Sequence, residues 1–320
     1  MATIARNISI HHVLCPTDFS EPAARAFEEA VRVARWFGAK VTVLHVIPPF
    51  VPVGDGMVYP TPLGEVRDAR IAELKSFIEG VDHRDVPIAL ECREGDPARE
   101  IRDAALETRA GLLVMGTHGR SGLGKLLLGS VTDAVLRNAP VPVLTVHPEA
   151  RRRKGSFRRI VCAADVSEWS AGTIGFALAM AGEGADRLTV LHVIEDVPEM
   201  LARSDGRIGL RDVEAYRRDL ERKAIAELQR LIPDEARVSC RIEEHVTYGE
   251  AHREIARIAA AENADLLVLG THGSRALDRM LFGSTVTKVV RTGRCPVLIV
   301  PAGHRWPATS LAPSHEATAV

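Results

Sequence analysis

Net charge, long apolar runs and paired cysteines are all scarce in this 320-residue sequence. The 41 basic and 42 acidic residues leave a formal net charge of −1, so no overall field attracts nucleic acid or an anionic membrane surface. No segment approaches the roughly 18 consecutive apolar residues of a membrane helix, and the first residues lack the apolar stretch of a secretory signal. We therefore expect a cytoplasmic protein whose partners include neither nucleic acid nor a membrane.

The cysteines show no CxxC pairing and no metal-ligand spacing. They are Cys15, Cys92, Cys162, Cys240 and Cys295. Four of them lie in apolar, strand-like runs, which predicts reduced residues in a core and not a redox or metal centre.

The sequence does contain a domain-sized internal repeat. Three landmarks recur in the same order: HHVLCPTDFSE at His11–Glu21 and RIVCAADVSEW at Arg159–Trp169, LHVI at Leu44–Ile47 and Leu191–Ile194, and GTHGRSGLGKLLLGS at Gly116–Ser130 and GTHGSRALDRMLFGS at Gly270–Ser284. A duplication explains this agreement better than chance. It predicts one domain at 1–147 and a second at 157–301, joined by the basic linker 148–156. We expect residues 302–320, which show no apolar periodicity, to form a flexible tail.

Within each copy, short apolar runs alternate with segments of helical period. In the first copy the runs are Val13–Cys15, Val41–Val46, Ile88–Glu91, Leu112–Met115 and Val141–Val146. Strands that alternate with helices imply a parallel sheet covered on both faces. We predict two tandem, doubly wound α/β domains of Rossmann-like type, each with about five strands. Ser20 and Ser167 are suited to begin the first helix of each copy, and Gly38 to end one of them.

Each copy ends in an apolar strand, at Val141–Val146 and at Pro296–Val300. Such a strand would leave an exposed sheet edge, which is an association hazard. We therefore expect the two domains to pair within the chain as a pseudo-dimer through these strands. Pairing of two chains into a homodimer is left open.

An unusual glycine spacing follows the fourth strand of each copy, a place where open parallel sheets bind ligands. The positions are Gly116, Gly119, Gly129 and Ser130 in the first copy, and Gly270, Gly273, Gly283 and Ser284 in the second. Glycines let the backbone approach a ligand closely and adopt positive φ, which exposes N–H groups to phosphate oxygens. The Gly-Ser pair opens a helix whose N-terminus favours an anion. The alternative is that the glycines only build tight turns, but the same spacing found twice favours phosphate binding.

With these motifs both copies resemble domains of the universal stress protein family, whose ATP-binding members carry Gly-x2-Gly-x9-Gly-Ser/Thr after the fourth strand. The resemblance covers nearly the whole chain except the linker, the long first loop and the tail. It implies that an aspartate ending the first strand and a backbone group near the end of the second recognise the nucleoside. The residues implied are Pro16, Thr17, Asp18, Val46 and Val131 in the first copy, and Ala163, Asp165, Val193 and Thr285 in the second.

Two features of these sites keep alternatives open. The aspartates Asp18 and Asp165 could instead cap the turns that follow them. Ala163-Ala164 stands in place of Pro16-Thr17, so we expect the second site to bind more weakly.

The histidines near the sites are weaker candidates. His118 and His272 lie inside the glycine loops, where a role as turn residues competes with ligand binding. No second ligand stands at metal spacing beside them, so we predict no metal site and no catalytic residue. His45 and His192 lie in the second strand of each copy and are expected to be satisfied core or pocket-wall residues.

The resemblance implies a stress-response regulator that binds an adenine nucleotide, ATP, with Mg²⁺ held mainly by the phosphates, and acts through its nucleotide-bound state. The sequence shows no dedicated base or arginine clamp, so any hydrolysis should be slow. One alternative is a nucleotidyl- or phosphoryl-transfer enzyme whose substrate pocket is formed partly by the loop Pro48–Gly64. The other is a nucleotide-free interaction module, which predicts loss of the glycine pattern in at least one copy.

Overall fold

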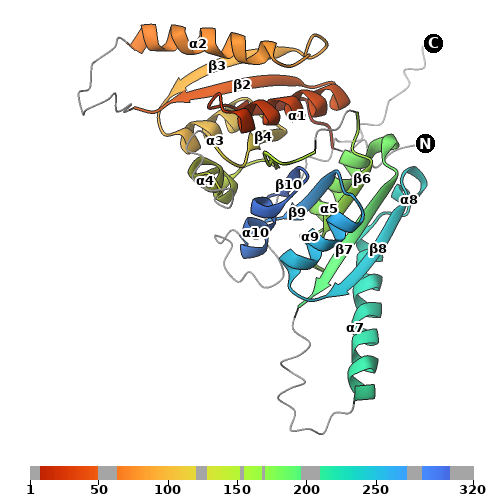
Figure 1. Cartoon of the computed structure of the whole chain (residues 1–320). Coiled ribbons are helices and arrows are strands. Elements are labelled where there is room, and N and C mark those ends of the chain that lie inside the picture. Colours follow the sequence, from red (N-terminus) through yellow and green to blue (C-terminus); the bar gives the residue numbers. More distant parts are fainter. Residues whose placement is uncertain are drawn as a thin grey trace, which may run out of the picture.

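The structure, a computed structural model, describes residues 8–49, 63–119, 128–151, 155–167, 170–195, 210–271 and 283–302. Over these residues, strands and helices alternate in two similar halves (Figure 1). The first half contains β1 (His12–Pro16), α1 (Glu21–Phe37), β2 (Lys40–Ile47), α2 (Leu63–Glu79), β3 (Ile88–Glu94), α3 (Pro97–Glu107), β4 (Leu112–Gly116), α4 (Ser130–Asn138) and β5 (Val143–Val146). The second contains β6 (Arg159–Ala163), α5 (Ser170–Ala181), the 3₁₀ turn η2 (Gly182–Gly184), β7 (Arg187–Ile194), α7 (Leu210–Leu231), α8 (Ala236–Ser239), β8 (Ile242–Tyr248), α9 (Ala251–Ala261), β9 (Leu266–Gly270), α10 (Ser284–Thr292) and β10 (Val297–Val300).

The described strands form one ten-stranded sheet, in the order β3-β2-β1-β4-β5-β10-β9-β6-β7-β8. Within each half the neighbouring strands are parallel, as predicted. The halves meet where β5 and β10 pair antiparallel, with Thr145 opposite Val297. The Thr145 hydroxyl also donates to the Val297 carbonyl at 3.1 Å in the buried interior. The predicted pairing of the two copies through their last strands is therefore confirmed.

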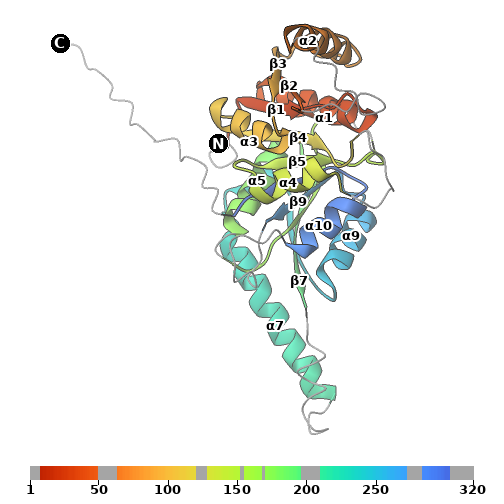
Figure 2. The same ribbon diagram turned by 90° about the vertical axis from the view of Figure 1, so that its left-hand side faces the viewer.

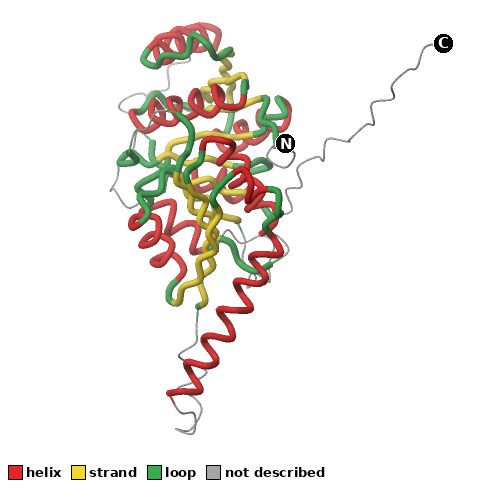
Figure 3. The backbone as a smooth tube through the Cα atoms, turned by 90° about the vertical axis from the view of Figure 1, so that its right-hand side faces the viewer, coloured by secondary structure: helices red, strands yellow, loops and turns green. Residues whose placement is uncertain are grey.

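Helices cover both faces of this sheet, which runs through the middle of the molecule (Figure 3). Phe27 of α1, Leu74 of α2 and Phe176 of α5 belong to the core cluster on one face. Leu136 of α4 and Val289 of α10 belong to the cluster on the other face. Each cluster draws residues from both halves, so the two copies share their apolar core. The N-terminal part of α7 extends away from this body (Figure 2).

Capping explains where the first helix begins and ends. The Ser20 hydroxyl accepts the N–H of Ala23 at 3.3 Å, and Gly38 ends α1 with φ of 64°. Both capping predictions are confirmed. In the second half, the Ser167 hydroxyl donates to a carboxylate oxygen of Asp165 at 2.5 Å. Residues 168–169 lie outside the described residues, so the helix start predicted at Ser167 stays a prediction.

Helix α1 also contacts the start of the second half. The Arg32 guanidinium lies 3.9 Å from the centroid of the Phe157 ring and 2.6 Å from the Glu29 carboxylate. The Arg32 and Glu29 side chains are only 11% and 10% exposed, and burial raises the pKa of Glu29. This ion pair therefore lies close to the junction between the halves.

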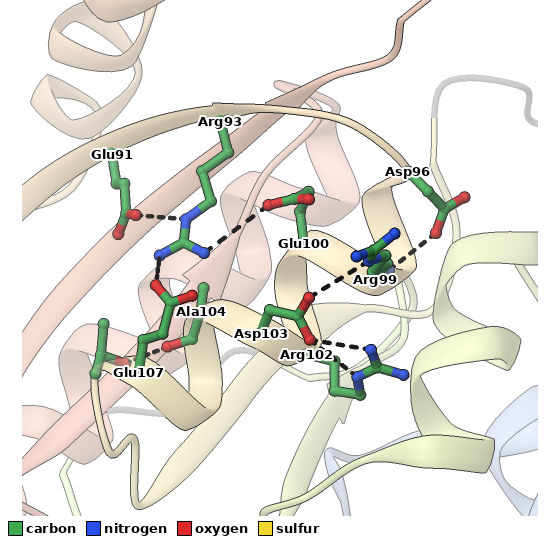
Figure 4. A network of polar contacts seen from close by, with 10 residues as sticks. Glu91, Arg93, Asp96, Arg99, Glu100, Arg102, Asp103, Ala104 and Glu107 are labelled. Carbon is green, nitrogen blue, oxygen red and sulfur yellow. Dashed lines mark hydrogen bonds and ion pairs between the residues drawn. The ribbon is translucent and has the colours of Figure 1, made fainter.

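The edge strand β3 carries a charge network instead of a bare apolar edge (Figure 4). Arg93 donates to Glu91 at 2.5 Å and to Glu107 of α3 at 2.7 Å, with Glu100 at 3.9 Å. Charged side chains on an edge discourage pairing with another chain.

The five cysteines are free and buried, which agrees with the expected core positions. Burial raises the pKa of both Cys15 and Cys162 to about 12. Among the described helices, none combines the length and the apolar character needed to cross a bilayer.

Candidate functional site

The candidate sites lie where the strand order reverses, between β1 and β4 in the first half and between β6 and β9 in the second. Asp18 and Asp165 follow β1 and β6, while Gly116 and Gly270 end β4 and β9. Because the carboxyl ends of parallel strands share one edge, the fold brings each aspartate to the same edge as the glycine loop of its copy. This edge is the usual ligand-binding position of a doubly wound sheet.

A pocket of about 520 Å³ lies at this edge of the second half. Predicted site residues that line it are Ala163, Asp165, Val193, Gly270, Gly283, Ser284 and Thr285. Ser170 of α5 and Glu195, which follows β7, also line it and were missed by the sequence analysis. The volume falls in the range of small-molecule sites, about 300–1,000 Å³.

Asp165 lines this pocket, and its two carboxylate oxygens differ in their partners. Its Oδ1 accepts the hydroxyls of Ser167 at 2.5 Å and Ser170 at 2.6 Å. Its Oδ2 is buried and has no hydrogen-bond partner within the described part of the chain. A buried acceptor without a donor is costly, so a ligand that donates a hydrogen bond would be stabilised here.

Glu195 joins two walls of the same pocket. Its Oε1 accepts the N–H of Ala251, the first residue of α9, at 2.8 Å. In the first half, α3 is capped from its own N-cap residue, because Asp96 accepts the N–H of Arg99 at 2.9 Å. The only sequence signal for this role is an acidic residue directly after an apolar strand.

In the first half, Asp18 lies close to the glycine loop. Its Oδ1 accepts both the N–H of Ser20, at 3.1 Å, and the Ser20 hydroxyl, at 2.5 Å. A Cβ added to Gly119 would lie 2.7 Å from Asp18 Oδ2. A side chain at position 119 would therefore require the Asp18 carboxylate to shift.

Positive φ, which the sequence analysis offered as one reason for these glycines, is wrong at the described positions. Gly129 and Gly283 both have φ of −60°, and neither Gly116 nor Gly119 is in the positive-φ region. Gly116 is needed because an added Cβ would lie 3.0 Å from the carbonyl oxygen of Pro22. At Gly116 and Gly119, close packing and not positive φ disfavours a side chain.

Both glycine loops close in the same way at their far end. The N–H of Gly129 donates to the carbonyl of Thr117 at 2.9 Å, and that of Gly283 to Thr271 at 3.3 Å. Gly129 and Gly283 are the N-caps of α4 and α10, and neither N-cap position supplies a side-chain hydrogen bond. Ser130 and Ser284, the first residues of these helices, are exposed. An anion placed here would meet first-turn N–H groups and a serine hydroxyl.

The remaining predicted residues divide into buried walls and undescribed loop positions. Pro16, Thr17 and Val46 are buried at the ends of β1 and β2, and Val131 packs against the core from α4. His272 and Gly273 lie outside the described residues.

The strand histidines are hydrogen-bonded, as expected, and His192 also lines the pocket of the second half. His45 Nδ1 donates to the carbonyl of Thr17 at 2.8 Å, and His192 Nδ1 to that of Ala164 at 3.0 Å. His118 Nδ1 lies 2.8 Å from the Thr117 hydroxyl, and burial lowers the pKa of His118. In the ranges that the structure describes, no three His, Cys, Asp or Glu side chains gather in a way that could hold a metal ion.

Known proteins share both the domain and the tandem arrangement. The family model described as universal stress protein family matches residues 9–147 and 156–301. A universal stress protein of Mycolicibacterium smegmatis is 28% identical over 297 residues, which cover 90% of this chain and 96% of the relative. One from Methanocaldococcus jannaschii is 36% identical over 139 residues, covering 42% of this chain and 80% of the relative. The crystal structure of a universal stress protein from Archaeoglobus fulgidus has a TM-score of 0.64 at 22% identity and covers 93% of this chain and 98% of that one.

The fold defines a class: a tandem, doubly wound α/β protein with a candidate glycine-loop site at the switch point of each half. Together with the family match over both halves, this shows that the chain belongs to the universal stress protein family.

Proposed function

We propose that this protein binds ATP in each of its two switch-point sites and acts in the stress response through its nucleotide-bound state. One observation carries the proposal: seven residues predicted from sequence, from four separate segments of the second copy, line a single pocket of about 520 Å³. They combine a strand-end aspartate, a glycine loop and a helix N-terminus. That combination suits a ligand with hydrogen-bond donors at one end and phosphates at the other.

Each part of the site has a distinct task in this proposal. The carboxylate of Asp18 or Asp165 accepts a hydrogen bond from the ribose or the adenine, and the backbone near Val46 or Val193 borders the nucleoside. The loop backbone and the first turn of α4 or α10 hold the phosphates, because first-turn N–H groups attract anions. Mg²⁺ would be held mainly by the phosphates.

Binding without rapid turnover is the expected behaviour. His45 and His192 each use Nδ1 to donate to a backbone carbonyl, so these rings are anchored in the pocket wall. Phosphoryl transfer also needs a positioned nucleophile and charge stabilisers around the γ-phosphate. We therefore expect slow release of inorganic phosphate from ATP.

The first experiment identifies small molecules released from freshly purified, heat-denatured protein by mass spectrometry, followed by calorimetric titration of nucleotide-free protein with ATP, ADP and GTP. Release of an adenine nucleotide and saturable ATP binding are the expected results. A chain that releases no nucleotide and binds none of the three would contradict the proposal, and rapid phosphate release would favour the transferase alternative.

A further inference from the structure

Three buried nitrogens without hydrogen-bond partners gather beside the first glycine loop. Within the described residues, Arg25 Nε, His118 Nε2 and His147 Nε2 are buried and unpaired. The two imidazole rings are edge to face, with centroids 5.4 Å apart. Arg25 Nη1 donates to the carbonyl of Ala150 at 3.3 Å, and the N–H of Ala150 bonds to the His147 carbonyl, so Arg25 lies against the turn that begins at His147. Each unmet polar atom is costly in a low-dielectric interior, so three in one place indicate a missing partner.

The protonation of His147 identifies the kind of partner. His147 is 8% exposed, and its Nδ1 accepts the N–H of Glu149 at 3.1 Å. Since that lone pair is used, the proton of the neutral ring resides on Nε2, which is then a donor. Burial lowers the pKa of His147, and the neighbouring His118 lowers it further, so the neutral ring is the relevant form at pH 7. Arg25 Nε is a permanent N–H donor.

These donors disfavour a metal ion and favour an acceptor. A metal needs the lone pair of Nε2, which His147 can offer only if the bond from Glu149 is broken. An oxygen of a phosphoryl group, by contrast, accepts from both an imidazole N–H and a guanidinium, and charge-assisted hydrogen bonds of this kind are strong.

The cluster borders the first site. His118 directly precedes Gly119, and its Cα lies 3.7 Å from the position of a Cβ added to Gly129, the N-cap of α4. The second copy has Gly172 and Pro301 where the first has Arg25 and His147. The cluster is thus a feature of the first copy alone.

We propose that Arg25, His147 and His118 form a phosphoryl-binding subsite of the first copy. The occupant is either a terminal phosphate of the nucleotide in the first site or free inorganic phosphate. The nucleotide source rests on the proposed function, whereas the free phosphate source does not. With nucleotide as the source, the first copy discriminates ATP from AMP more strongly than the second.

The test uses the full chain with Asp165→Ala, which impairs the second site, and compares ATP with AMP by calorimetry. His147→Phe keeps the ring but removes the Nε2 donor, and Arg25→Met keeps much of the side-chain length but removes the guanidinium. If the nucleotide is the occupant, each variant should lower ATP affinity by about tenfold and leave AMP affinity unchanged. His11→Phe, at an exposed histidine, is the matched control and should change neither.

A measurement on the unmutated chain protects the test against variants that fail to fold. Long-range ¹H–¹⁵N NMR of the histidine rings should report the Nε2–H tautomer for His147. Its Nε2 resonance should move on addition of inorganic phosphate or of ATP but not of AMP, while that of His11 stays in place.

Movement with inorganic phosphate identifies free phosphate as an occupant, and movement with ATP alone identifies the nucleotide. No movement with either, together with an unchanged ATP/AMP ratio in both variants, overturns the proposal, as does stoichiometric binding of Zn²⁺ at His147 Nε2. A phosphate-induced shift in a chain that binds no ATP would contradict the proposed function and leave the subsite standing.

Discussion

The turns that follow β1 and β6 come from the same repeated motif but are held by different residues. In the first copy, Thr17 Oγ1 accepts the N–H of Phe19 at 2.9 Å, and the Phe19 ring packs 4.5 Å from that of His45. In the second, Ala164 offers no hydroxyl, and Val166, which matches Phe19, is 41% exposed. Ser170 holds the second aspartate instead, by donating to Asp165 Oδ1. The aspartate has therefore kept its position in both copies, while the residues that hold its turn differ. This difference predicts two sites of related chemistry and unequal affinity for ATP.

The substitution with the largest expected effect should remove ATP binding from the first site and leave the second site intact. Gly119→Val should abolish binding at the first site, because its Cβ would displace Asp18 from 2.7 Å away. We expect a loss of at least about 3 kcal/mol, roughly a hundredfold in Kd, with the second site unchanged. Calorimetric stoichiometry should fall from two ATP per chain to one. Gly64→Val is the control, because an added Cβ there meets nothing within 4 Å; two full sites in Gly119→Val would refute the assigned loop.

A second difference between the copies concerns stability. Glu29 and Arg32 of α1 form a buried pair where α5 has the buried residues Phe176 and Ala179. Arg32→Met leaves the Glu29 carboxylate buried and unpaired, so unfolding free energy should fall by about 3 kcal/mol. By contrast, Phe176 and Ala179 at the matching positions of α5 are uncharged, so a substitution there would leave no buried charge without a partner.

The pH dependence of the Arg32→Met effect has a definite sign. Burial already raises the pKa of Glu29 above its usual 4.5, and removal of Arg32 raises it further. A carboxyl with a raised folded pKa makes the protein less stable as pH rises from the unfolded value through the folded one. Urea unfolding should therefore show a larger loss at pH 8 than at pH 5. An equal loss at both would contradict this account. Arg99→Met, at an exposed arginine whose partner Asp103 is partly exposed, should change stability little.

The two aspartates provide a direct test of equivalence. Asp18→Asn and Asp165→Asn should each weaken ATP binding at their own site by about 1.5 kcal/mol, roughly tenfold in Kd, because a charged acceptor is replaced by a neutral one. Titration of each variant should show one weakened and one unchanged site. If either change leaves both sites intact, that aspartate only supports its turn.

The substitution with the smallest expected effect makes the second site more like the first. Ala164→Thr should let a hydroxyl accept the N–H of residue 166, as Thr17 does for Phe19. Thr17 is 7% exposed in the first copy, as is Ala164 in the second, so the native fold already tolerates a threonine at this kind of position. We expect tighter ATP binding at the second site by about 1 kcal/mol. Unchanged or weaker binding in a variant of unchanged Tm would show that the turn does not set affinity.

The sequence predicted the fold well because its signals are local and occur twice. Apolar runs, the cap at Ser20 and the glycine at position 38 each act within a few residues. The internal repeat also shows the pattern of strands and helices twice. The pairing of β5 with β10 was also predictable, because an apolar strand at a sheet edge tends to pair with another strand.

Parts of the site were not predictable because they depend on tertiary distances. The sequence placed Asp18 and Gly119 in one site but could not show the 2.7 Å separation of an added Cβ from the carboxylate, and it suggested positive φ where close packing is the cause. Glu195 binds the backbone of Ala251, and Arg25 reaches the turn at His147, across long sequence separations. Such partners become visible only when the sheet brings the strand ends together.

Native mass spectrometry of the full chain in excess ATP and Mg²⁺ tests the central claim most directly. We predict two mass increments of one nucleotide each, with the second increment appearing at a higher ATP concentration than the first. A chain that stays free of nucleotide, or that accepts only one per chain at saturation, would contradict the account of two nucleotide sites.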